Sequence, residues 1–191
     1  VKTAVVDGHT VWTATDNIKV FYNGTSVEAE LKTGENTSSA TFEAAVGTAT
    51  DYYAVYPASE TASMADGVIT VTLPANQDGS FGAGHVAVAK AADKTFTFTN
   101  VNAFLKMTFA SAKYTRIVVE SVGGQALAGD LTVTFADGAA VIGSTYANTS
   151  STVEVTSDEA FAAGDLYISV LPGVTHTQGV LVSCYNGAEK V

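Results

Sequence analysis

Apolar and polar residues alternate with a period of two along most of the chain. These runs lie at 10–15, 18–22, 26–32, 39–43, 52–56, 68–73, 94–99, 103–109, 115–122, 131–135, 153–156, 166–170 and 180–185. Successive side chains of a strand point to opposite faces, so this repeat is typical of strands with one buried face. No window has a clear repeat of 3.6 residues, although 159–163 is compatible with a single helical turn.

Turn residues separate the alternating runs. Asn23-Gly24 joins two runs at the spacing of a two-residue hairpin. Similar pairs punctuate the rest of the chain, at 66–67, 78–79, 123–124 and 137–138. Many short strands at this spacing predict an all-β fold, with residues 1–191 forming a single antiparallel β-sandwich domain.

The apolar alternates of the runs define an expected core. Its members are Trp12, Phe21, Phe42, Val55, Phe96, Phe98, Leu105, Phe109, Val118, Phe135, Ile168 and Val170. Composition supports the same fold class, because Thr, Val and Ile supply 56 of the 191 residues. Side chains branched at Cβ fit a pleated surface better than a helix.

Charge and hydropathy exclude several classes of function. Nine Lys and Arg residues against 19 Asp and Glu residues give a net charge of −10. Such a chain repels a phosphate backbone, so nucleic acid is excluded as a main partner. No run of about 18 apolar residues is present, so we expect no membrane-spanning segment.

Candidate chemistry is sparse. His9, His85 and His176 are far apart, and none has a second His or Cys at the local spacing of a metal site. The chain has no Gly-x-Ser-x-Gly elbow. The lone Cys184 lies in an apolar run, where a buried small hydrophobic side chain is the simplest interpretation. We therefore expect no enzyme, with no catalytic, cofactor-binding or metal-binding residue and no cofactor.

Two other interpretations stay open at this stage. Paired carboxylates for glycoside hydrolysis need only meet in space, although Glu28 and Glu30 fit solvated positions on one strand face. Alternation places Tyr52 and Tyr56 on one face and Tyr53 on the other. One set is expected in the core, and the other is a candidate sugar-stacking platform or interface.

Several sequence segments, taken in their order along the chain, resemble one protein family. They are Trp12 with 16–21, then 52–57, 68–77, 96–106, 127–133 and 166–173. The set is similar to the N-terminal domain of the fimbrillins of the Bacteroidales, the FimA-type and minor-fimbria-type major fimbrial subunits. It covers most of the chain, residues 10–187.

The resemblance implies an architecture and a location. The fold would be a fimbrillin-like, transthyretin-like Greek-key sandwich. The protein would be a cell-surface fimbrial subunit or adhesin, exported as a lipoprotein precursor to the outer membrane or a fimbrium. Its partners would be other fimbrial subunits or further copies of itself, joined by donor-strand exchange, with a host protein or glycan as adhesion ligand. The alternative from composition is a surface glycan-binding β-sandwich module.

The chain departs from the family pattern in three places. Cys184 is not an N-terminal lipobox cysteine, so a lipid anchor would lie outside this chain. No Arg precedes Val1, and Arg116 falls inside a predicted strand. Residues 186–191 end where the family usually continues into a second β-domain, which would be absent or truncated here.

These departures lead to an expectation about assembly. Residues 1–191 alone are expected to be monomeric, because like charge opposes association unless a strand is donated. A longer chain that carries the missing C-terminal segment is expected to oligomerise once an N-terminal strand near Val1–Val11 is removed.

Overall fold

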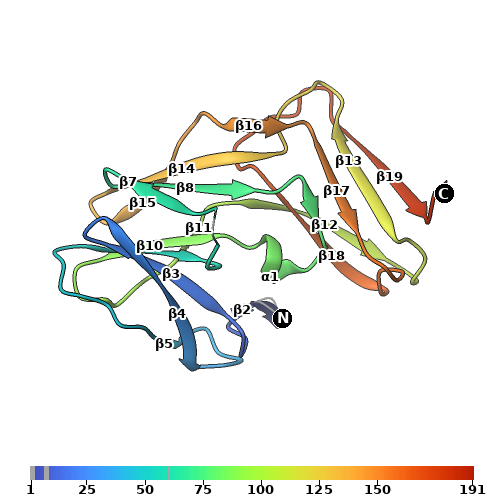
Figure 1. Cartoon of the computed structure of the whole chain (residues 1–191). Helices are drawn as coiled ribbons and strands as arrows, with labels where there is room; N and C mark the ends of the chain where they lie inside the picture. Colours follow the sequence, from blue (N-terminus) through green and yellow to red (C-terminus); the bar gives the residue numbers. More distant parts are fainter. Residues whose placement is uncertain (1–2, 7–8, 60) are drawn as a thin grey trace. The chain divides into compact units, whose positions relative to one another are not determined.

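The computed structural model describes residues 3–6, 9–59 and 61–191. It is all-β, as predicted, with several antiparallel sheets (Figure 1). The chain divides into two compact units. Unit 1 contains Val1–Val71, His85–Val101 and Thr132–Gly143, and unit 2 contains Thr72–Gly84, Asn102–Leu131 and Ser144–Val191. Each unit has a hydrophobic cluster of its own.

The elements are short and follow one another closely. They are β1 (Ala4–Val6), β2 (His9–Val11), β3 (Asn17–Tyr22), β4 (Thr25–Thr33), β5 (Thr41–Glu43), β6 (Tyr52–Tyr56), β7 (Ser63–Ala65), β8 (Val68–Leu73), β9 (Asn76–Gln77), α1 (Phe81–Gly84), β10 (Ala87–Ala91), β11 (Thr99–Asn100), β12 (Ala103–Phe109), β13 (Arg116–Ser121), β14 (Ala128–Ala136), β15 (Ala139–Ile142), β16 (Ala147–Ser150), β17 (Thr152–Thr156), β18 (Gly164–Val170), β19 (Val180–Asn186) and β20 (Glu189–Lys190).

The main sheet of unit 1 has the strand order β11-β10-β6-β3-β4-β5, and its pairs are antiparallel. The hairpin between β3 and β4 turns at Asn23 and Gly24, whose φ angles are +48° and +74°. Both values belong to the left-handed region that a type I′ turn requires. The turn predicted from the Asn-Gly pair is therefore present.

Both faces of the main sheet are apolar. One face carries the cluster of unit 1, which comprises Ile18, Val20, Ala29, Tyr52, Ala54, Tyr56, Ala87 and Ala89. On the other face, Tyr53 of β6 contacts Phe135 of β14 edge to face, with ring centroids 5.7 Å apart. Strand β14 belongs to a second sheet, whose order is β15-β14-β8-β7. Phe135 of this second sheet thus covers Tyr53 on one face of the main sheet, and the cluster lies on the opposite face.

Unit 2 is built from a five-stranded sheet and a strand pair. The sheet has the order β20-β19-β13-β17-β9, and β12 pairs with β18. Buried side chains from both lie in one cluster, which includes Ile117, Val119, Val153, Val155, Leu166 and Ile168. Leu105, Met107 and Phe109 of β12 pack against it. Two apolar layers therefore enclose the core, as in a sandwich.

The expected core is confirmed in part. Phe21, Val55, Ile168 and Val170 are buried. Most of the others are half-buried, namely Trp12, Phe42, Phe96, Phe98, Leu105, Phe109 and Phe135. Val118 is also half-buried, but it lies outside the cluster of unit 2, and the fully buried apolar residues of β13 are Ile117 and Val119. These three residues are consecutive and all apolar, so alternation did not distinguish the two faces.

Two local predictions were also wrong. The run 94–99 is not one strand, since only Thr99–Asn100 pairs, with β10. The possible helical turn at 159–163 is irregular, and the helical turn described by the structure is α1. An alternating sequence predicts which side chains point inward. A strand also requires a neighbouring strand that hydrogen-bonds to its backbone. The Greek-key, transthyretin-like topology and the assignment of 1–191 to one fimbrillin-like domain stay predictions.

Candidate functional site

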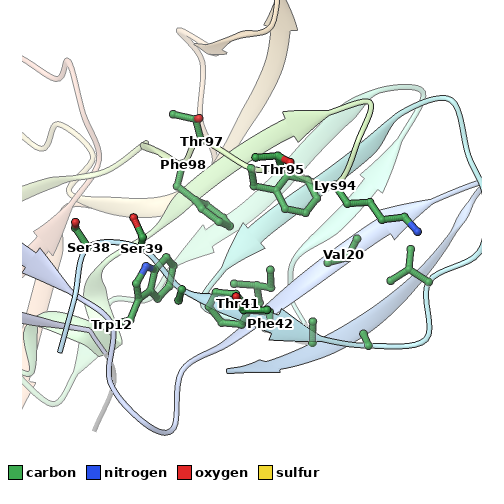
Figure 2. A pocket seen from close by; sticks show the side chains of 16 residues that line it. Trp12, Val20, Ser38, Ser39, Thr41, Phe42, Lys94, Thr95, Thr97 and Phe98 are labelled. Carbon is green, nitrogen blue, oxygen red and sulfur yellow. The ribbon is translucent and has the colours of Figure 1, made fainter. Parts of the chain in front are cut away.

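A groove of about 700 Å³ lies in unit 1, on the face of the main sheet that carries the cluster (Figure 2). Ile18 and Val20 of β3 and Ala29 of β4 line it from the sheet. Its walls come from two segments outside the centre of the sheet, residues 38–46 and 94–98. The groove is within the size range of sites that hold ligands.

Apolar side chains from both wall segments line the groove. Phe42, Ala44 and Val46 are alternate residues of one segment, and Phe96 and Phe98 are alternate residues of the other. In the second segment, Thr95 and Thr97 alternate with these rings and are exposed. The alternate apolar side chains of both segments therefore point into the groove. They do so even where the backbone does not belong to a sheet.

Trp12 and Lys94 lie at opposite ends of the groove (Figure 2). The Trp12 ring meets Phe42 edge to face at 5.0 Å and Phe98 at 5.7 Å between centroids, so it contacts both walls. Lys94 places its Nζ 5.1 Å from the centre of the Tyr52 ring. Hydroxyl groups of Ser38, Ser39, Thr41, Thr95 and Thr97 complete the lining. The groove is thus apolar with a hydroxyl-bearing rim and a cation at one end.

The backbone of both walls is unpaired beside the groove. The N–H and C=O groups of 44–46 and 96–98 form no hydrogen bond with any part of the chain that the structure describes. Exposed, unpaired backbone next to apolar side chains is a template for another strand. The arrangement can therefore hold an extended chain through both side-chain burial and backbone hydrogen bonds.

A buried polar cluster lies beneath the Trp12 end of the groove. Asp16 is fully buried, and its Oδ2 accepts from the Thr13 N–H at 2.7 Å. Its Oδ1 accepts from the Tyr56 hydroxyl at 2.8 Å and from the Thr3 N–H at 2.9 Å. Burial raises the pKa of the Tyr56 hydroxyl. No local motif marks this cluster, because its members come from separated parts of the chain, at residue 3, residues 13–16 and residue 56.

The histidines have different surroundings. His9 is exposed on β2, and His85 is buried in the polar cluster of unit 1. His176, in unit 2, contacts the Ser121 hydroxyl through Nδ1 at 2.9 Å. Within the described residues, no three His, Cys, Asp or Glu side chains are grouped as a metal site would require.

The burial of the three tyrosines of β6 shows which face of the strand lies in the core. Tyr52 and Tyr56 are in the core, which confirms the expectation for one set. Tyr53 is half-buried on the opposite face, where it contacts Phe135 and lies 5.3 Å from the Lys90 ammonium. The aromatic side chains that line a concave surface are instead those of the groove.

Cys184 of β19 packs against the cluster of unit 2, and burial raises the pKa of its thiol. A raised pKa lowers the thiolate fraction, and the thiolate is the reactive form. We expect iodoacetamide at pH 8 to alkylate Cys184 more slowly in the folded chain than in urea, because the folded chain holds a smaller fraction of thiolate and half-buries the sulfur. Intact-mass analysis over time measures this, and equal rates would contradict it.

No helix of the described residues is long and apolar enough to cross a membrane. Comparison with protein-family models, with curated protein sequences and with solved structures finds no match to this chain.

Proposed function

We propose that the protein is a non-enzymatic cell-surface subunit or adhesin of the fimbrillin type, and that its groove receives a strand from a neighbouring subunit. The unpaired backbone of 44–46 and 96–98, on the two walls of one apolar groove, carries this proposal. The resemblance of the sequence to fimbrillins supports it.

Strand addition explains both features of the groove. In this mode of recognition, main-chain hydrogen bonds supply affinity, and pockets for alternate side chains supply specificity. A strand lying along the walls would place every second side chain over Ile18, Val20 and Ala29. Its other side chains would meet the hydroxyl groups of the rim. A donor with alternating apolar and polar residues fits these two environments.

The source of the strand follows from the proposed class. Donor-strand exchange would join this chain to other fimbrial subunits or to a second copy of itself. With a net charge of −10, two copies repel each other, so association needs the stabilisation that a buried, backbone-paired strand provides. The proposed location is the outer membrane or a fimbrium, with attachment through a lipid anchor on the precursor.

A glycan-binding module is the second candidate. It is favoured by the aromatic rings of Trp12, Phe42, Phe96 and Phe98 together with the hydroxyl rim, because sugars stack on rings and bond to hydroxyl groups. A glycan needs no backbone hydrogen bonds from the walls, whereas a strand does. This difference allows one experiment to separate the two candidates.

The experiment is site-specific photocrosslinking in the cells that produce the protein. Benzoylphenylalanine replaces Thr97, an exposed residue of the groove wall, and in a matched control it replaces Thr134, which is exposed on β14 outside the groove. We expect Thr97 to give adducts at multiples of the subunit mass. Peptide mapping should place the crosslink in an extended segment of a fimbrial subunit.

Other outcomes decide against the proposal. Adducts with carbohydrate at Thr97 would favour the glycan-binding module. Equal adducts from Thr97 and Thr134, or no adduct from Thr97, would contradict strand addition at the groove. A screen for hydrolysis of glycan and ester substrates tests the non-enzymatic part separately, since turnover by the purified chain would contradict it.

A further inference from the structure

The groove lies between the two edges of the main sheet of unit 1. Strand β5 forms one edge of this sheet, and β11 forms the other. One groove wall contains β5 and continues through 44–46, and the other wall, 94–98, leads directly into β11. Phe42 and Phe98, from the two walls, both contact the Trp12 ring. The edges of the sheet therefore approach each other across this ring, and the groove is the gap between them (Figure 2).

Both sides of the gap carry backbone groups that can pair with a strand. As terminal strands, β5 and β11 each have a ladder with one neighbour only. The backbone groups of 44–46 and 96–98 are unpaired in the part of the chain that the structure describes. One inserted strand can therefore bond to both edges, and the main sheet then has no open edge beside the groove.

The directions of the two walls limit how such a strand can lie. Neighbours in this six-stranded sheet are antiparallel, so β5 and β11 run in opposite directions. The Trp12 N–H donates to the Thr37 carbonyl at 2.9 Å, just before one wall begins, and the Trp12 ring contacts Phe98 at the end of the other wall. The first wall thus runs away from Trp12, and the second runs toward it. A strand between them is parallel to one wall and antiparallel to the other.

The wall that contains β5 offers the longer edge for pairing. Its edge extends over 41–46, whereas the edge of the other wall extends over 96–100, because Lys94 turns the chain with a φ of +68°. Antiparallel ladders are slightly more stable per residue than parallel ones. The antiparallel pairing is therefore expected along 41–46. The bound strand then runs from the Lys94 end of the groove to the Trp12 end.

Lys94 gives the groove a charge at one end. Its Nζ lies 5.1 Å from the centre of the Tyr52 ring, and it forms no ion pair with the Asp and Glu residues that the structure describes. The nearby Lys90, by contrast, is paired with Asp51 at 3.1 Å. Among the described residues that line the groove, none is Asp or Glu. This end of the groove therefore attracts a carboxylate and repels an ammonium group.

We propose that the groove selects an extended segment that closes the gap in the main sheet, runs antiparallel to 41–46 and carries an Asp or Glu in its N-terminal half, beside Lys94. This inference rests on the proposed function and specifies the direction and the charge of the donated strand. Its acidic residue distinguishes it from other alternating segments, because a Lys or Arg at the same place is repelled.

Crosslinking from the two ends of the groove tests the direction. Benzoylphenylalanine replaces Ser39 at the Trp12 end or Thr95 at the Lys94 end, both of which are exposed, in the cells that produce the protein. Peptide mapping should place the Thr95 adduct nearer the N-terminus of the donated segment than the Ser39 adduct. The reverse order would overturn the inference, as would adducts in two unrelated segments.

Charge reversal tests the acidic residue. In the chain that carries the crosslinker at Thr97, Lys94→Glu should lower the yield of adducts by about two- to fivefold, the effect of an exposed ion pair, and Lys94→Arg should keep it. Lys113→Glu is the matched control, because Lys113 is exposed in unit 2 and its Nζ lies 5.6 Å from the Tyr114 ring. Replacing the mapped acidic residue of the donor by lysine should restore the yield with Lys94→Glu, which a misfolded variant would not allow.

The outcomes separate this inference from the proposed function. No adduct from Thr97, or equal adducts from Thr97 and Thr134, contradicts both. Adducts from Thr97 that are unchanged by Lys94→Glu overturn this inference and leave strand addition at the groove standing. A mapped segment without an acidic residue in its N-terminal half has the same consequence.

Discussion

Replacing Asp16 by alanine is expected to lower the free energy of unfolding by about 3–5 kcal/mol. The Asp16 carboxylate is fully buried and accepts from Thr3 N–H, Thr13 N–H and the Tyr56 hydroxyl. Each donor left buried without an acceptor costs about 1–3 kcal/mol. Water can enter the space left by the side chain and relieve part of this, so the total is smaller than three full penalties.

Urea unfolding followed by Trp12 fluorescence measures the change, because Trp12 packs directly on Tyr56. Asp93→Ala is the matched control. Asp93 is exposed and accepts from Thr95 N–H at 3.0 Å, so its removal should cost less than about 1 kcal/mol. Similar losses in the two variants would show that the buried cluster contributes no more than an ordinary turn.

Ile168→Ala is expected to cost about 2–5 kcal/mol, the range for large-to-small changes in a core. Ile168 of β18 is fully buried in the cluster of unit 2, and it pairs with Leu105 of β12. Truncation removes its contacts and leaves a cavity between the strand pair and the five-stranded sheet. The surrounding strands are hydrogen-bonded and close such a cavity only in part.

Far-UV circular dichroism in urea measures the loss for Ile168→Ala. Leu181→Ala is the control, because Leu181 of β19 lies in the same unit and is 51% exposed. Its truncation removes less apolar surface from the folded core and should cost less than about 1 kcal/mol. Equal midpoints for the two variants would mean that the core of unit 2 is not where the structure places it.

The sequence by itself determined the fold class, the hairpin at Asn23-Gly24 and the inward direction of Phe96 and Phe98. These are local properties. A period of two sets which side chains share a face, and the Asn-Gly pair supplies the positive φ angles of the turn. Each can be predicted without knowing what any residue contacts in the folded chain.

Tertiary structure alone decided the rest. Three consecutive apolar residues, 117–119, fit either face of β13, and pairing of Ile117 with Val155 and Cys184 selected the buried one. Residues 94–98 alternate like a strand, yet none of the strands that the structure describes pairs with them, and this leaves the groove open. Thr3, Asp16, Tyr56 and His85 meet only because four distant segments converge, and contacts at long sequence separation leave no local pattern to read.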